Sequence, residues 1–425
     1  MLNRTEAPPI KDAIDFNFEL KPFEKFTLDN GVEVYAVDAG AEAVLQVEWI
    51  FAAGNSFEEN NLVASTTNYL LKNGTATKTA FEVNDYFEYY GAFLNRSAQH
   101  EKAGLSLHCL TRYAGDLMPV VAELIKTSVF PEPELQLYQQ NNKQRLEVNL
   151  KKSEFVAGRL IDEYLFGIDH PYGKYSSAAD YDALTRQQLV SFYQQYYQDS
   201  HFTIFIAGKL PAGIDGLLNK HFGQFPVQSN SNKIIHPIKP SSERKYRITN
   251  DSEGVQGSIR LGRSFPNRHH PDYIRASVLN NIFGGFFGSR LMTNIREDKG
   301  YTYGIHSYIQ SHLQESAWMV STEAGREVCE ATITEVYKEM TLLRSKPVSE
   351  DELLLVKNYI LGSVLGDLDG PFHIMGKWKN IILNNLPLNH FEYSIDEIKA
   401  VTATDLQELA NRYLVPGDFY ELVVI

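Results

Sequence analysis

The stretch NIREDKGYTYG, residues 294–304, holds the clearest candidates for chemistry in this chain. Arg296 and Tyr303 lie seven positions apart, on either side of Gly300. A guanidinium and a phenol both donate hydrogen bonds, so two such groups that converge on one point could stabilise a developing oxyanion. The structural alternative is that the arginine favours the carboxyl end of a helix while the tyrosine packs in a sheet.

The neighbouring residues predict how these two side chains are positioned. Residues 289–299, SRLMTNIREDK, have a helical pattern, and Gly300 would cap that helix because glycine readily adopts a left-handed conformation. Residues 301–309, YTYGIHSYI, alternate as a strand does. The turn between them would bring an arginine late in the helix near a tyrosine early in the strand.

Other catalytic signatures are missing from the sequence. There is no G-x-S-x-G elbow, no phosphate-binding loop and no G-x-G-x-x-G after a strand. The glycine-rich run FGGFFG, residues 283–288, lacks the Lys and Ser/Thr of a phosphate loop. The 12 histidines include no H-x-x-E-H or H-x-x-x-H pair, so we expect no helical zinc motif.

Composition narrows the classes of partner and compartment. The chain has 425 residues, enough for two or three domains, and a net charge of -13. That charge argues against nucleic acid or an anionic membrane as the main partner. Two cysteines, Cys109 and Cys329, fit a reduced, cytoplasmic protein and cannot form a cysteine zinc site by themselves. The first 20 residues lack the pattern of a secretory signal, and no apolar run is long enough to span a membrane.

A helix–turn–strand unit occurs twice in the sequence. LTRQQLVSFYQQYYQDSHFTIFIAG, which starts at Leu184, aligns with VTATDLQELANRYLVPGDFYELVVI, which starts at Val401, at a constant offset of 217 residues. Each copy begins with a threonine suited to cap a helix, Thr185 and Thr402. The repeat predicts that the chain consists of two related halves that end alike.

The beginnings of the two halves and the segment between them complete this prediction. Residues 231–245 are rich in Ser, Asn, Pro and Lys and predict a linker between an N-terminal half, 1–230, and a C-terminal half, 246–425. The Asn30-Gly31 pair predicts a hairpin turn near the start of the first half. Strands, then helices, then a closing strand predict an α+β fold in which each half is a mostly antiparallel sheet with helices on one face. The expected helices are 62–74, 114–130, 133–155, 273–298, 329–345 and 349–368.

Several motifs, taken in order, give the chain a family resemblance over almost its whole length. They are LDNGVEVYAV, LLKNGT, YYGAFLNRSA, DHPYGK and SRLMTNIREDKGYTYG. Together with the two-half layout, they resemble the pitrilysin/insulysin superfamily of zinc peptidases, and most of all its short bacterial and mitochondrial-processing-peptidase members. The resemblance implies a fold of two homologous halves and a peptide substrate.

The resemblance also locates a degenerate zinc motif. Active members carry H-x-x-E-H on the first long helix, where the histidines bind zinc and the glutamate acts as general base. Counting back nine residues from Gly74 places that motif at residues 65–69. Ser65 and Tyr69 replace the histidines and Asn68 replaces the glutamate. The third ligand would fall near Glu147 or Asn149, and we expect no metal in this chain.

The same resemblance assigns a role to the Arg/Tyr pair. In related peptidases an arginine, and a tyrosine seven residues later, bind the substrate carbonyl opposite the zinc. Arg296 and Tyr303 have that spacing, which favours Tyr303 over its competitor Tyr301. Some relatives have an aromatic residue four positions before the arginine, and here Met292 stands there as a candidate substrate contact.

Three glycines of the FGGFFG run resemble the glycine-rich loop that touches substrate in the processing enzymes. They are Gly284, Gly285 and Gly288. The alternative is that this run is a helix break that permits close packing.

Donors for a carbonyl oxygen without a metal cannot hydrolyse a peptide alone. The sequence therefore predicts the non-zinc subunit of a heterodimeric zinc peptidase. A homologous partner would supply H-x-x-E-H, the zinc cofactor and the general base, and the substrates would be unfolded or short peptides. The alternative is a non-catalytic scaffold or peptide-binding protein, as in the family's relatives in a respiratory complex.

Overall fold

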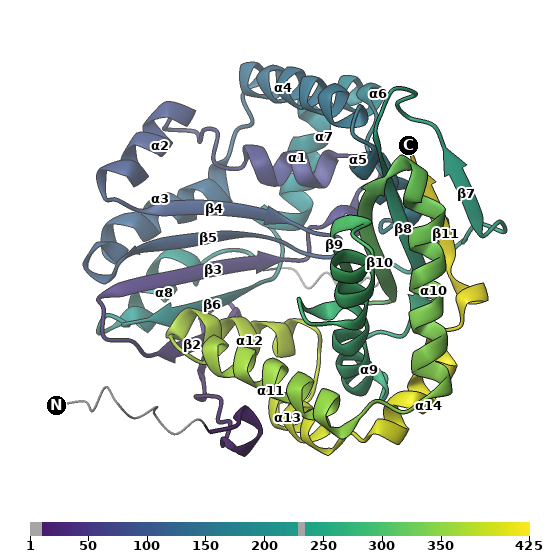
Figure 1. Ribbon diagram of the computed structural model, residues 1–425. Helices are drawn as coiled ribbons and strands as arrows, with labels where there is room; N and C mark the ends of the chain where they lie inside the picture. The colour runs from purple at the N-terminus through teal and green to yellow at the C-terminus, as the bar shows by residue number, and fades with distance from the viewer. Residues whose placement is uncertain (1–10, 228–233) are drawn as a thin grey trace, which may run out of the picture. The chain divides into compact units, whose positions relative to one another are not determined.

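The computed structural model describes residues 11–227 and 234–425, and it confirms the predicted α+β fold (Figure 1). These residues group into two compact units, neither of which is continuous in the sequence. What we call the N-terminal unit contains the described residues of 21–260 together with 370–379 and 420–425. What we call the C-terminal unit contains residues 11–20, 261–369 and 380–419.

The first sheet has six strands in the order β1-β2-β6-β3-β5-β4. Neighbouring strands are antiparallel except β2 and β6, which are parallel. The predicted hairpin is present between β1 and β2, where Gly31 has a φ of 87° and donates its N–H to the Leu28 carbonyl. The strands are β1 (Glu24–Thr27), β2 (Glu33–Asp38), β3 (Val44–Phe51), β4 (Phe93–Ala98), β5 (Ala103–Leu110) and β6 (Phe202–Gly208).

The second sheet has five strands in the order β7-β11-β8-β10-β9, so β9 lies at its edge. β7 is parallel to β11, and β9 is antiparallel to β10. The strand that ends each half, β6 or β11, therefore runs parallel to a strand near the beginning of the same half. The strands are β7 (Lys245–Ile248), β8 (Gln256–Phe265), β9 (Thr302–Ser311), β10 (Ser316–Gly325) and β11 (Tyr420–Val424).

The helices that precede the two closing strands confirm the sequence repeat. Thr185 caps α7 and Thr402 caps α14, and each hydroxyl accepts a hydrogen bond from the backbone N–H three residues later. In each case the side chain of that third residue, Gln188 or Asp405, accepts a bond from the threonine N–H. These are reciprocal capping boxes, and each cap stabilises its helix by about 1 kcal/mol.

Most predicted helices are found close to their expected bounds. The predicted continuous helix over residues 273–298 is wrong, because α9 ends at Asn280 and two π-helical turns, Asn281–Gly285 and Met292–Asp298, flank a break. The helices are α1 (Val63–Leu70), α2 (Ala80–Tyr89), α3 (Ala114–Thr127), α4 (Glu132–Leu150), α5 (Ser153–Phe166), α6 (Ala178–Ala183), α7 (Arg186–Tyr193), α8 (Ile214–Phe222), α9 (Tyr273–Asn280), α10 (Cys329–Ser345), α11 (Glu350–Asp367), α12 (Pro371–Leu383), α13 (His390–Ala400) and α14 (Ala403–Tyr413).

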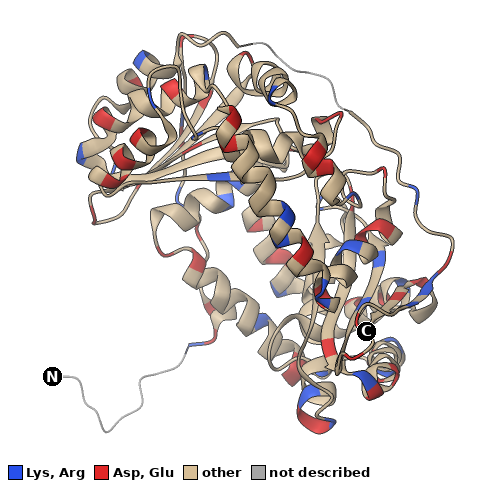
Figure 2. Cartoon of the chain, turned by 90° about the horizontal axis from the view of Figure 1, so that it is seen from above, with Lys and Arg blue, Asp and Glu red and all other residues tan. Residues whose placement is uncertain are grey.

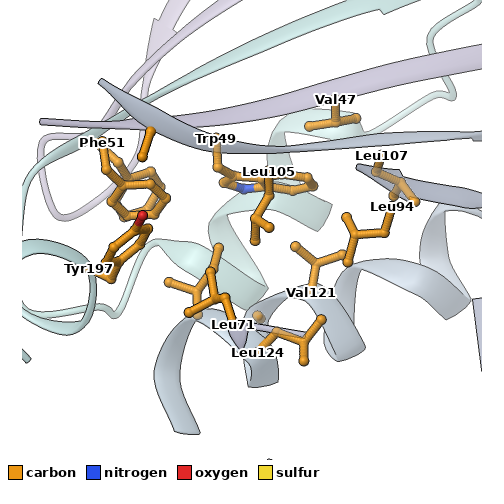
Figure 3. Close-up of a cluster of buried hydrophobic side chains, with 14 of the residues drawn as sticks. Val47, Trp49, Phe51, Leu71, Leu94, Leu105, Leu107, Val121, Leu124 and Tyr197 are labelled. Carbon is orange, nitrogen blue, oxygen red and sulfur yellow. The ribbon is translucent and has the colours of Figure 1, made fainter. Parts of the chain in front are cut away.

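The core of the N-terminal unit lies between one face of the six-stranded sheet and its helices (Figure 3). Alternate residues of β3, namely Val47, Trp49 and Phe51, point to this face and are buried. Val121 and Leu124 of α3 meet them from the helical layer. The alternation follows from the two-residue period of a strand, which sends successive side chains to opposite faces.

The segment predicted to be a linker is partly described. Residues 231–233 lie outside the described residues, and residues 234–244 contain no helix or strand. Backbone hydrogen bonds from Lys239 to Phe166 and from Ser241 to Tyr164 tie this segment to α5. The division into 1–230, 231–245 and 246–425 remains a prediction.

Charged residues of both signs are interspersed along the described helices (Figure 2). Over residues 11–227 and 234–425, no helix combines the length and the apolar content needed to cross a lipid bilayer.

Candidate functional site

Arg296 lies in the π-helical turn Met292–Asp298 of the C-terminal unit. The wider turn is visible in the bond from the Lys299 N–H to the Asn294 carbonyl, 3.0 Å, which spans five residues. Asn294 also anchors the turn to α10, since its side-chain amide donates to Glu335 at 3.0 Å and to Glu339 at 2.7 Å. Turns of this kind are rare and occur often at functional sites.

The guanidinium of Arg296 stacks on an aromatic ring of the glycine-rich run. Its Cζ lies 4.5 Å from the centre of the Phe287 ring, and 62% of Phe287 is exposed. The attraction of a cation to a ring face holds the guanidinium while leaving its edge open. Among the described residues, no hydrogen bond or ion pair engages this side chain, so its donors are available to a ligand.

Tyr303 is the second residue of β9 and is 93% exposed. The chain reaches it through Gly300, which has the expected positive φ of 66°, and through a bond from the Tyr301 N–H to the Ile295 carbonyl. Within the described part of the chain, no hydrogen bond involves the Tyr303 hydroxyl. The structure therefore places both predicted donors on consecutive elements, with the tyrosine at the surface rather than packed in the sheet.

The glycines of the FGGFFG run have different environments. Gly284 is buried, and a Cβ there would lie 2.7 Å from Ser307 Cβ and 2.8 Å from Ser307 N on β9. Its prediction as a substrate contact is corrected, because close packing against β9 explains the glycine. Gly285 is partly exposed and Gly288 is exposed. Gly288 lies on an open hollow of about 580 Å³ that Arg290 and Glu352, paired at 2.8 Å, also line.

Met292 is also not a surface contact for a substrate. Its side chain is buried, with 3% exposed, and its Sδ accepts a hydrogen bond from the Ile305 N–H. It packs in the interior because the π-helical turn directs both Met292 and Ile295 inward. The prediction of Met292 as a substrate-binding residue is therefore corrected.

The predicted degenerate zinc motif lies on α1 in the N-terminal unit. Ser65 and Tyr69, one turn apart, share the partly exposed side of the helix. The Ser65 hydroxyl donates to the Leu62 carbonyl at 3.2 Å. Asn68 is 2% exposed, and its amide donates to the Gly104 carbonyl at 3.3 Å and to the Tyr197 hydroxyl at 3.1 Å. Asn68 thus serves as an internal tie between α1 and the core.

An aromatic and cationic cluster surrounds Tyr69. Its ring centre lies 4.8 Å from that of Tyr138 on α4 and 4.4 Å from the guanidinium carbon of Arg96 on β4. Burial raises the pKa of Tyr138, and the nearby hydroxyls of Thr66 and Ser65 oppose that shift. Burial lowers the pKa of Arg96, while Tyr69 opposes the shift.

Sequence reasoning placed the third ligand position too late on α4. Glu147 is exposed and Asn149 is partly exposed, whereas Tyr138, three turns earlier, is the residue of α4 that meets Tyr69. The spacing of Leu135, Tyr138 and Leu146 along α4 follows the helical period, so this face could have been found from the sequence.

The comparisons with known proteins agree with this architecture. Residues 183–360 match the family model described as "Peptidase M16 inactive domain". This segment belongs to the peptidase M16 inactive-domain family. The predicted resemblance to zinc peptidases is confirmed by relatives of the whole chain.

Two relatives come from Bacillus subtilis. "Uncharacterized zinc protease YmxG" is 21% identical over 398 residues, which cover 92% of this chain and 95% of that protein. "Probable inactive metalloprotease YmfF" is 24% identical over 233 residues, 53% of each chain. A solved structure, the "peptidase M16 inactive domain from Pseudomonas fluorescens", has a TM-score of 0.84 at 24% identity and covers 95% of this chain and 98% of its own. The chain is thus an inactive M16-type domain related to zinc proteases.

The names of these relatives raise the question of whether zinc fits the M16-type motif position. Zinc in proteins takes imidazole, thiolate and carboxylate ligands. The motif position offers a hydroxyl, a carboxamide that is bonded internally and a phenol, from Ser65, Asn68 and Tyr69. The cation Arg96, stacked on Tyr69, would also repel a metal ion. Among the described residues, no three His, Cys, Asp or Glu side chains are grouped to hold a metal, and the residues present do not fit zinc.

Proposed function

We propose that this chain is the metal-free subunit of a two-subunit zinc peptidase. Arg296 and Tyr303 bind the carbonyl oxygen of a peptide substrate, and a homologous partner supplies H-x-x-E-H, zinc and the general base. The observation that carries the proposal is a contrast between two sites. The C-terminal unit presents two donors that nothing in its described residues engages, while the motif on α1 offers no ligand set for zinc.

The chemistry of the two donors supports a role in the transition state. Attack of hydroxide on a peptide carbonyl makes an oxyanion, and donors aimed at that oxygen lower the barrier. Arg296 is held from below by the Phe287 ring, and its π-helical turn is fixed to α10 through Asn294. Held in this way, the donors lose little conformational freedom when a substrate binds.

The compartment and substrates belong to the same proposal. Both cysteines are free and buried, and burial raises the pKa of Cys109 to about 11. Such thiols are unreactive and compatible with the reducing cytoplasm. Unfolded or short peptides are the expected substrates, because an extended chain exposes its carbonyls to both subunits.

The test begins with affinity purification of the native protein and identification of what accompanies it. We expect a homologue that contains H-x-x-E-H and zinc. In the reconstituted complex, Arg296→Ala or Tyr303→Phe should lower turnover by about 10- to 1,000-fold with little change in assembly. Matched controls are Arg112→Ala, an arginine stacked on Tyr113 at 4.7 Å, and Tyr89→Phe, an exposed tyrosine on α2.

Two results would decide against the proposal. If no zinc-bearing homologue co-purifies, the heterodimer is refuted. If the complex forms and cleaves peptides, but the Arg296 and Tyr303 variants match the controls, the chain acts as a non-catalytic scaffold.

A further inference from the structure

Arg96 on β4 is a half-buried cation without a carboxylate partner in the described chain. One of its terminal nitrogens, Nη1, donates to the Tyr69 carbonyl and to Asn73 Oδ1, the latter at 3.2 Å. Both acceptors are uncharged. A guanidinium that is partly removed from water normally pairs with an anion, because uncharged acceptors replace its hydration incompletely.

The surrounding charges do not neutralise Arg96. Lys72 adds a second cation nearby, since burial and then the charge of Arg96 lower the pKa of Lys72. Of the two nearby carboxylates, Glu134 accepts a hydrogen bond from Asn73 at 2.7 Å, and Glu88 acts on Lys72. Neither forms an ion pair with Arg96 in the described chain. The result is a local cationic position in a chain whose net charge is -13.

Two tyrosines give this position an apolar wall. The Tyr69 ring lies under the guanidinium at 4.4 Å and is 46% exposed, and the Tyr138 ring lies 4.8 Å from it. A guanidinium that stacks through its face still presents its edge, and that edge matches the two oxygens of a carboxylate. The exposed aromatic surface beside it can cover an apolar side chain.

The C-terminal unit repeats this arrangement. Arg296 stacks on Phe287 at 4.5 Å, and the adjacent Phe286 stacks on Tyr359 of α11 at 4.7 Å. Tyr69 and Phe286 are also separated by 217 residues, the offset of the sequence repeat. An arginine on an aromatic ring, with a second ring from the following long helix, is therefore a feature of both halves.

We propose that Arg96, Tyr69 and Tyr138 form a binding site for the C-terminal carboxylate of a peptide. The carboxylate pairs with the open edge of Arg96, and the last side chain, aromatic or large and apolar, packs on the tyrosines. A carboxylate fits better than a phosphate, because Glu134 and Glu88 would repel a dianion. The site binds without cleaving, since the residues of α1 supply no metal or base. It is independent of the proposed function, because it uses only the N-terminal unit.

The test is calorimetric titration of the full chain, alone, with N-acetyl-Ala-Phe as the free acid and as the C-terminal amide. We expect the acid to bind at least about tenfold more tightly than the amide, the difference made by one charge-assisted hydrogen-bond pair. Arg96→Gln should weaken binding of the acid by about 10- to 100-fold and leave the amide unchanged. Arg96→Lys, which keeps the charge but lacks the planar fork, should lie between.

The matched control is Arg112→Gln, because Arg112 also stacks on a tyrosine, Tyr113, at 4.7 Å. It should bind the acid as the unsubstituted chain does, and circular dichroism should show that all variants are folded. Equal affinity for acid and amide, binding of neither, or equal losses in the Arg96 and Arg112 variants would overturn the proposal. Because no partner subunit is used, failure here leaves the heterodimer untouched, and failure of the heterodimer leaves this result untouched.

Discussion

Gly284→Ala tests whether the glycine-rich run serves packing or substrate binding. The added Cβ would lie 2.7 Å from Ser307 Cβ and 2.8 Å from Ser307 N. Ser307 cannot move aside easily, because it is buried and its hydroxyl bonds to Asn280 at 2.7 Å and to Trp318 Nε1 at 2.9 Å. Overpacking against a fixed strand costs about 1–3 kcal/mol, so we expect the free energy of unfolding to fall by that amount.

Urea denaturation followed by circular dichroism measures this change. The midpoint should fall while the dependence of the unfolding free energy on urea stays the same, as expected for a native-state clash. The matched control is Gly362→Ala in α11, where the nearest atom to an added Cβ is Ala13 Cβ at 4.0 Å. It should be neutral or stabilising by up to about 1 kcal/mol. An unchanged midpoint for Gly284→Ala would refute the packing argument, and lost peptide turnover in that stable variant would restore the substrate role.

Three further predictions concern the metal, the zinc-motif helix and acid stability. The purified chain alone should contain no stoichiometric zinc by atomic emission, and one tightly held zinc per chain would contradict the site assignment. Asn68→Asp should destabilise the protein by about 3–5 kcal/mol, because a buried carboxylate would face the Gly104 carbonyl and lose the bond to it; an unchanged unfolding midpoint would show that this bond contributes nothing. Burial lowers the pKa of both His100 and His170 to about 4, so the unfolded chain binds more protons between pH 6.5 and 4. Stability should therefore fall with decreasing pH across that window, by up to about 1.4 kcal/mol per pH unit for each histidine, and replacing both by Gln should flatten the profile measured by urea titration.

Local patterns in the sequence determined much of the fold. The repeat, the caps at Thr185 and Thr402, and the Asn30-Gly31 turn were predicted correctly, because each depends on residues within a few positions of one another. The chemistry at residues 65–69 is likewise a property of the sequence, since Ser, Asn and Tyr cannot supply the ligands or base of a zinc peptidase in any fold.

The break in the predicted helix 273–298 and the burial of Met292 depended on packing. A π-helical turn differs from an α-helical turn by one residue, so periodicity did not reveal where Met292 would point. Gly284 could be read as a packing residue only once β9 was seen against it.

The arginines show most clearly what tertiary structure decided. Arg96 follows Tyr69 by 27 residues, and Tyr138 follows Arg96 by 42. Nothing local in the sequence joins them, and only the pairing of β4 in the sheet and the packing of α4 near α1 brings the three side chains together. The sequence determined that zinc chemistry was absent from α1, whereas the fold decided which charged and aromatic groups stand beside that helix, because contacts between distant residues depend on chain topology rather than on local pattern.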